Sequence, residues 1–155
     1  MTHRFHLADT AATERLGAGL ARALGGGMVV QLHGDLGTGK TTVVRGALRA
    51  LGWTGPVKSP TYTLVEHYSF SRLYFYHFDF YRFDDPAEWE NAGFAEYFRP
   101  DSVCLIEWPE RAAEFITQVD LRLRLAMAED GRTLSASAPT AEGRACLVAL
   151  AATSI

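Results

Sequence analysis

Hydrophobic residues recur at helical spacing in several parts of the chain. In the first of them, Leu16, Leu20 and Leu24 lie four residues apart, and Asp9 and Thr10 precede them as residues that can cap a helix. Three consecutive glycines then end the helix. Spacing and cap residues together predict helices over residues 9–24, 40–51, 86–97 and 141–151.

Other stretches are apolar throughout or alternate between apolar and polar residues, which is typical of strands. Residues 103–106 form a short, wholly apolar run, as in a strand that is covered on both faces. Turn residues separate stretch 62–68 from 73–80 and stretch 119–125 from 132–138, and each of these pairs is expected to form an antiparallel hairpin. The predicted strands cover residues 28–32, 62–68, 73–80, 103–106, 119–125 and 132–138.

The order of strand, glycine loop and helix over residues 28–51 decides the fold class. It indicates an α/β protein: a P-loop NTPase-like domain with a mainly parallel central sheet, antiparallel hairpin additions and flanking helices. A chain of 155 residues with 48% hydrophobic residues is large enough for one core. We therefore expect a single domain over residues 1–155.

Charge and composition exclude several classes of protein. The net charge of −3 argues against a broad basic surface that binds nucleic acid by counterion release alone. No stretch approaches the roughly 20 apolar residues of a membrane span, and residues 1–10 lack a signal-peptide run, so a cytoplasmic protein without a membrane partner is expected. Cys104 and Cys146 stand in apolar surroundings and are predicted to be buried free thiols.

The glycine loop carries the clearest chemical signal. Residues 34–41 match the pattern G-x-x-x-x-G-K-[ST], in which backbone N–H groups at a helix start surround the phosphates of a nucleotide. Lys40 would place a positive charge on the outer phosphates, and the Thr41 hydroxyl would bind Mg²⁺. The sequence therefore predicts a site for ATP and Mg²⁺. Its other predicted nucleotide contacts are Asp35, Gly37, Thr38, Gly39 and Thr42.

A P-loop site also needs an acid that holds the metal or orients a water molecule. Two predicted strands end on a carboxylate, at Asp79 and at Glu107. Acids at the carboxyl ends of parallel strands lie at the sheet edge where the P-loop lies. The residues alone do not decide which of the two binds Mg²⁺, because each could also pair with an arginine or cap a loop.

Three further features have weaker signals. Ser59, Thr61 and Thr63 stand in a segment that could order around a γ-phosphate, or could be an ordinary proline turn before a strand. Trp108 could be a core aromatic residue or a handle for a partner. His77 is expected to be packed between strands rather than to be catalytic.

Four segments in order resemble the TsaE family, the bacterial ATPases of tRNA threonylcarbamoyladenosine biosynthesis. They are residues 34–42, 59–65 (SPTYTLV), 76–82 (YHFDFYR) and 105–110 (LIEWPE), and the resemblance runs from about residue 9 to residue 111. The chain departs from the family pattern at Ile116–Thr117, where a Leu-Pro pair is usual, and at His33, where an aromatic residue often precedes the P-loop.

The resemblance implies a small P-loop fold that binds ATP and Mg²⁺ and hydrolyses ATP slowly. It also implies TsaB and TsaD as partners, with tRNA bound through the complex and hydrolysis serving to reset it, while the group transfer is done elsewhere. Thr41 and Glu107 correspond to Mg²⁺ ligands, and Asp79 corresponds to an acid that orients water or metal. Thr10 and Arg132 correspond to positions near the nucleotide. The resemblance places Ser59, Thr61 and Thr63 in a switch-like loop and Trp108 beside the catalytic acid.

Two other functions remain open at this stage. A small-molecule kinase would use the same phosphate site but needs a lid with several arginines, and the chain shows no such cluster. A non-enzymatic switch would use ATP to order residues 59–63 and form a partner surface. A GTPase is disfavoured because the chain has no Asn-Lys-x-Asp segment.

Overall fold

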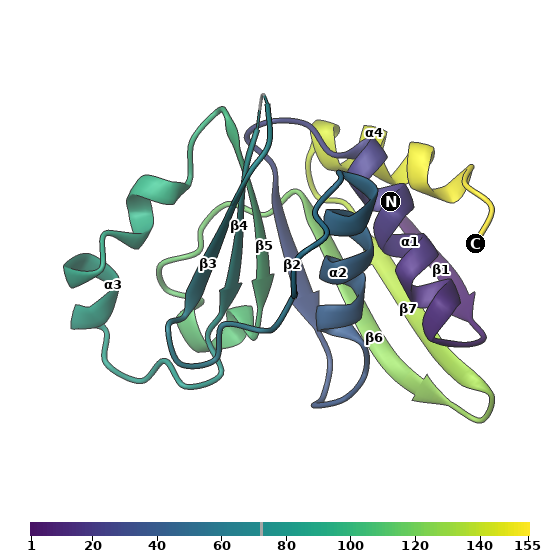
Figure 1. Cartoon of the computed structure of the whole chain (residues 1–155), viewed down its shortest axis with the longest axis horizontal. Coiled ribbons are helices and arrows are strands. Elements are labelled where there is room, and N and C mark those ends of the chain that lie inside the picture. The colour runs from purple at the N-terminus through teal and green to yellow at the C-terminus, as the bar shows by residue number, and fades with distance from the viewer. Residues whose placement is uncertain (72) are drawn as a thin grey trace.

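The structure is a computed structural model that describes residues 1–71 and 73–155, and over these residues it forms one seven-stranded sheet with helices on its faces (Figure 1). The strand order across the sheet is β1-β7-β6-β2-β5-β4-β3. The strands are β1 (Thr2–Leu7), β2 (Val29–His33), β3 (Val65–Ser69), β4 (Tyr74–Asp79), β5 (Ser102–Glu107), β6 (Leu121–Ala128) and β7 (Gly131–Ser137).

The middle of the sheet is parallel, and its two margins are antiparallel. Strand β2 pairs in parallel with β5 and β6, and β4 pairs in parallel with β5. The β3–β4 and β6–β7 hairpins extend the sheet on either side, and β1 adds an antiparallel strand next to β7. The predicted α/β fold with a mainly parallel centre and hairpin additions is confirmed.

The helices begin and end near the predicted residues in three of four cases. They are α1 (Thr10–Ala23), α2 (Lys40–Ala50), α3 (Ala87–Asn91) and α4 (Ala141–Ala151), with 3₁₀ turns η1 (Phe94–Tyr97) and η2 (Pro109–Ala112). The Asp9 carboxylate accepts a hydrogen bond of 2.8 Å from the Ala12 N–H and so caps α1. Over the described residues, no helix has the length and apolar character that crossing a membrane requires.

The predicted helix over residues 86–97 was wrong in its extent. It ends at Asn91, and Gly93 adopts a left-handed conformation with φ of 69° before the 3₁₀ turn η1 begins. The left-handed backbone is readily adopted by glycine and breaks the hydrogen-bond ladder of a helix. The break turns the Phe94 side chain into the core, where it is buried.

The predicted strands differ most from the structure at β3 and β1. Strand β3 begins at Val65 and not at residue 62, because Leu64 has φ of 69° and its N–H donates to the Pro60 carbonyl, closing a turn. Strand β1 was not predicted at all. Of its residues only Phe5 and Leu7 are buried, so the edge strand lacks a strong apolar pattern.

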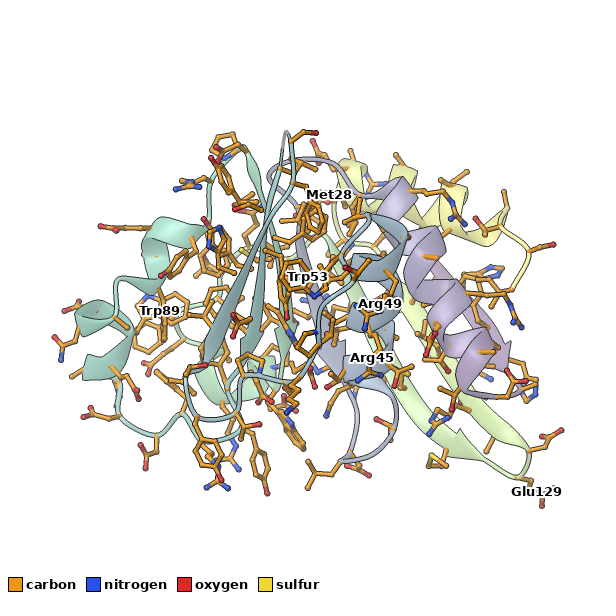
Figure 2. All side chains as sticks on the ribbon, in the orientation of Figure 1. Met28, Arg45, Arg49, Trp53, Trp89 and Glu129 are labelled. Carbon is orange, nitrogen blue, oxygen red and sulfur yellow. The ribbon has the colours of Figure 1, made fainter. Side chains whose placement is uncertain are left out.

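Two hydrophobic cores lie on opposite faces of the sheet. The larger one joins the sheet to α1, α2 and α4, which Figure 1 shows on one side of the β2–β6–β7–β1 half. The smaller one covers the other face of β2, β5 and β4 with the aromatic side chains of residues 83–115, and Trp89 lies among them (Figure 2). Strand β5 is buried on both faces, as its apolar run predicts.

Both cysteines are free and buried, as predicted. Burial raises the pKa of Cys104 to about 12 and that of Cys146 to about 11. At neutral pH both groups are therefore protonated thiols inside the core.

Candidate functional site

The glycine loop follows β2 directly and turns back into α2 at one edge of the sheet. Gly34, Gly37 and Gly39 all have positive φ, at 147°, 80° and 107°. A Cβ atom on Gly34 would lie 2.6 Å from the Thr38 hydroxyl and 2.7 Å from the Leu125 carbonyl, so no larger residue fits there. The loop leaves the N-terminus of α2 open toward the space above the sheet, which is the geometry of an anion site.

The Lys40 side chain is buried and folds back over this loop. Its Nζ donates to the carbonyl oxygens of Gly34 and Asp35 and lies 3.8 Å from the centre of the Trp108 ring. Burial lowers the pKa of Lys40 below its ordinary value, and the nearby charges of Glu107 and Asp79 oppose this effect. The ammonium group therefore lies between the loop carbonyls and two carboxylates.

The two candidate acids are neighbours at the same sheet edge. Asp79 and Glu107 end β4 and β5 and are direct register partners in the parallel pair. Both are almost fully buried, with exposed fractions of 4% and 3%. Because β5 also pairs with β2, the acids lie beside the start of α2, and the Thr41 hydroxyl donates to the Glu107 carboxylate at 2.9 Å.

Glu107 is in contact with three polar side chains. Besides the bond from Thr41, His77 Nε2 lies 2.6 Å from Glu107 Oε2, and Ser59 Oγ lies 3.2 Å from the same oxygen. Burial by itself raises the pKa of Glu107. The hydrogen bond and the charge interaction with His77, the hydrogen bond from Thr41 and the positive charge of Lys40 outweigh burial and hold that pKa below its usual range. Glu107 is thus kept as a carboxylate despite its burial.

His77 contacts the candidate site, although the sequence analysis assigned it to packing alone. Its ring is 1% exposed, so the prediction that it packs between strands is confirmed. Packing does not exclude a contact with the site, however, and its Nε2 holds the Glu107 carboxylate. The other ring nitrogen, Nδ1, has no partner among the described residues. The only sequence signal was the i, i+2 spacing from Asp79, which alone does not indicate a role.

The segment before β3 closes one side of the site. The Ser59 hydroxyl donates to the Asp79 carboxylate, and Thr61 Oγ1 lies 3.5 Å from the same oxygen. Asp79 also accepts a hydrogen bond of 2.9 Å from the Tyr81 N–H. Thr63 lies in the turn before β3 and is exposed, and its hydroxyl donates to the carbonyl of Val65, the first residue of that strand.

Trp108 and Arg132 complete the walls. Trp108 has φ of 55°, is partly buried, and packs against Tyr81 with the ring centres 5.0 Å apart. Arg132, at the start of β7, donates from Nη2 to the Gly37 carbonyl at 3.4 Å, while its buried Nε has no partner among the described residues. A guanidinium with an unused buried N–H suits an anionic ligand at this place.

These residues enclose an open cavity of about 260 Å³. Its lining contains most of the residues that the sequence singled out: Gly37, Gly39, Lys40, Thr41, Thr42, Ser59, Thr61, Asp79, Glu107, Trp108 and Arg132, together with Leu36. Four candidates do not line the cavity. Thr10 and Thr63 are exposed, Thr38 is buried within the loop itself, and the Asp35 carbonyl accepts a hydrogen bond from the Thr38 N–H.

The site fits a hard divalent cation next to a phosphate chain. Thr41, Asp79 and Glu107 present only oxygen atoms, and Lys40 and Arg132 supply positive charge on the phosphate side. Mg²⁺ prefers such oxygen ligands and few protein carboxylates. The residues present therefore fit Mg²⁺ bound together with a nucleoside triphosphate.

Residues 7–134 match the family model described as threonylcarbamoyl adenosine biosynthesis protein TsaE. The chain belongs to the TsaE family. The matched residues include the glycine loop, both acids, the 59–63 segment and Arg132, so the whole cavity lies within the shared part of the fold.

Individual relatives agree with this assignment. A TsaE protein of Haemophilus influenzae is 45% identical over 117 residues, which cover 76% of this chain and 74% of the relative. A TsaE protein of Bacillus subtilis is 40% identical over 122 residues, covering 79% and 74%. The crystal structure of Bacillus subtilis YdiB superposes with a TM-score of 0.83 at 28% identity and covers 97% of this chain and 95% of that one.

Proposed function

We propose that this TsaE-family protein binds ATP with Mg²⁺ in the cavity above the sheet edge and hydrolyses it slowly. Relatives of the chain carry the name tRNA threonylcarbamoyladenosine biosynthesis protein TsaE, which supports a role for this chain in the same biosynthesis. We further propose that it acts with TsaB- and TsaD-type proteins and meets tRNA through that complex. The observation that carries the proposal is the joint placement of Lys40, Thr41 and Glu107 around one cavity.

Each wall residue has a distinct task in this proposal. Backbone N–H groups of the glycine loop and Lys40 hold the phosphates, and Thr41 and Glu107 hold Mg²⁺, which neutralises phosphate charge when bound. Asp79 orients a water molecule and accepts its proton as the water oxygen attacks the γ-phosphorus. The bond to the bridging oxygen breaks, and ADP and phosphate leave.

Replacing Lys40 by alanine tests the phosphate site. We expect ATP affinity to fall about tenfold to hundredfold, because a charged hydrogen bond to phosphate is worth about 1.5–3 kcal/mol. Isothermal titration with MgATP measures the change. Arg22→Ala, at an exposed position in the last turn of α1, is the matched loss of a positive charge and should leave affinity unchanged. Wild-type ATP affinity in Lys40→Ala would refute the site.

Replacing His77 tests whether it positions Glu107. We expect His77→Ala to lower kcat about tenfold with little change in ATP affinity, because the loss of one hydrogen bond lets the carboxylate leave its place. His77→Gln keeps an N–H donor and should recover part of the rate. His67→Ala, on the exposed side of β3, is the control. Equal rates in His77→Ala and His77→Gln would show that the donor is irrelevant.

A non-enzymatic switch is the second candidate, and one contact favours it. The Ser59 hydroxyl bridges Asp79 and Glu107, so a ligand that engages either acid would move the 59–63 segment. Under this alternative, ATP binding creates a partner surface and turnover is incidental. A Glu107→Ala protein that still supports threonylcarbamoyladenosine formation with its partners at the wild-type level would favour the switch over the ATPase.

A further inference from the structure

The face of β1, β7 and β6 that points away from α1 and α2 is exposed and strongly cationic. In register across the strands, Arg4 pairs with Ser135 and Ser135 pairs with Arg124, while Arg122 pairs with Ser137 in the next row. The three arginines are exposed. We call this surface the arginine face; its members are Thr2, Arg4 and His6 of β1, Thr133, Ser135 and Ser137 of β7, and Arg122, Arg124 and Ala126 of β6, with His33 of β2 at its margin.

The arginine face has no internal neutralisation. None of its members is acidic, and over residues 1–71 and 73–155 Arg4, Arg122 and Arg124 make no ion pair and no side-chain hydrogen bond. Burial and the charges of Arg124 and Arg122 lower the pKa of His33, against the opposing charge of Glu110 from η2. The lowered pKa favours an uncharged His33 at the edge of the arginine face. The N–H groups of the three guanidinium groups are free to donate hydrogen bonds to a ligand.

The net charge of −3 conceals a separation of charge along the molecule. Residues 84–96 contain five acidic residues and no lysine or arginine, and they surround α3. Figure 1 shows α3 at one end of the molecule and β1 at the other. An anionic partner is thus attracted to the arginine face and repelled from the α3 end, which orients it.

The chemistry of the arginine face matches a phosphate backbone. Guanidinium and hydroxyl groups alternate on it, and both donate hydrogen bonds to phosphate oxygens. Along β6 the Cα atoms of Arg122 and Arg124 are about 7 Å apart, and Arg4 lies two strands away at about 10 Å, so several phosphates are within reach at once. Thr2, His33, Arg122, Arg124, Ser135 and Ser137 also line a cavity of about 160 Å³.

A protein partner fits this surface less well. The cores of protein interfaces are apolar and rich in aromatic residues, whereas the only apolar member of the arginine face is Ala126. Met127, although exposed, belongs to the opposite side of β6 by register, next to Arg132. The surface therefore offers charge and hydrogen bonds but no hydrophobic anchor.

We propose that the arginine face itself binds the phosphate backbone of RNA, separately from the nucleotide cavity and in addition to the contact with tRNA through the partner proteins. The choice of RNA over another polyanion rests on the proposed function in tRNA modification. Binding is expected to be weak and independent of sequence, with a Kd on the order of 10⁻⁵ M at low salt and a log–log salt slope of about −2 to −3 for three arginines.

Fluorescence anisotropy with a fluorescein-labelled RNA hairpin tests the proposal. The triple variant Arg4→Glu/Arg122→Glu/Arg124→Glu should bind at least about tenfold more weakly, with a flatter salt slope. The control Arg15→Glu/Arg22→Glu/Arg144→Glu makes the same charge change at exposed positions of α1 and α4 and should retain most of the binding. Unchanged circular dichroism and ATP hydrolysis would show that both triple variants are folded.

Three results would overturn the proposal. The first is that the wild-type protein binds no RNA at low salt, and the second is that the two triple variants lose RNA affinity equally. The third is that the arginine-face variant loses its affinity for polyglutamate but not for RNA, which would assign the surface to an acidic polypeptide. ATP hydrolysis measured on the same preparations keeps the two proposals apart. Hydrolysis without RNA binding refutes only this inference, and RNA binding without hydrolysis refutes only the ATPase.

Discussion

Replacing Glu107 by glutamine is expected to lower the rate of Mg²⁺-dependent ATP hydrolysis about 100- to 1,000-fold. Glutamine has nearly the same shape but no charge, so it binds Mg²⁺ poorly and leaves the phosphate charge uncompensated. It also loses the charge-assisted bonds that Thr41 and His77 make to the carboxylate. Phosphate release under single-turnover conditions measures the chemical step directly.

Glu129→Gln is the matched control for this experiment. Glu129 lies at the tip of the β6–β7 hairpin, as Figure 2 shows, and it does not line the cavity. The substitution removes the same charge, and the rate should stay at the wild-type value. If Glu107→Gln hydrolyses ATP as fast as Glu129→Gln, the acid at the end of β5 has no part in catalysis.

Replacing Gly46 by alanine is expected to destabilise the protein by about 3 kcal/mol. Gly46 lies where α2 crosses α1, and a Cβ atom on it would be 2.2 Å from the Glu14 carbonyl oxygen. Gly17 on α1 has the reciprocal position, 2.2 Å from the Val43 carbonyl. Alanine raises helix propensity by about 1 kcal/mol over glycine, but a backbone contact this short forces the helices apart and outweighs that gain.

Urea unfolding followed by circular dichroism measures this effect, with Gly25→Ala as the control. A Cβ atom on Gly25 meets no atom within 4 Å, so its stability should change by less than about 0.5 kcal/mol. Because α2 begins at Lys40, a shifted helix should also weaken ATP binding in Gly46→Ala. A stabilised Gly46→Ala protein would mean that the two helices are not in contact at this point.

The elements with strong local signals were predicted correctly from the sequence. Helix α1 has its cap and leucine spacing within 16 residues, and the glycine loop follows from glycines that readily adopt its positive φ angles. The failures lie where the local signal is weak. The helix over residues 86–97 was overextended because one glycine with φ of 69° breaks it, and β1 has only two buried residues.

The candidate site was predicted in composition more than in geometry. The sequence proposed Asp79 and Glu107 because each ends an apolar strand, and their lateral pairing put both carboxylates against Ser59. It left the place of Trp108 open, and the structure puts its ring under Lys40. His77 was assigned to packing alone because its contact with Glu107 joins residues of different strands.

By itself, the sequence determined the fold class, the glycine loop and the residue types of the candidate site, because these depend on backbone preferences and hydrophobic spacing within short segments. Only the tertiary structure decided which segments are neighbours. Strand order and register join Thr41 to Glu107, His77 to Glu107, and Arg4 to the row that holds Arg124. Such pairings depend on the simultaneous burial of both sheet faces, and no local pattern along the chain contains that information.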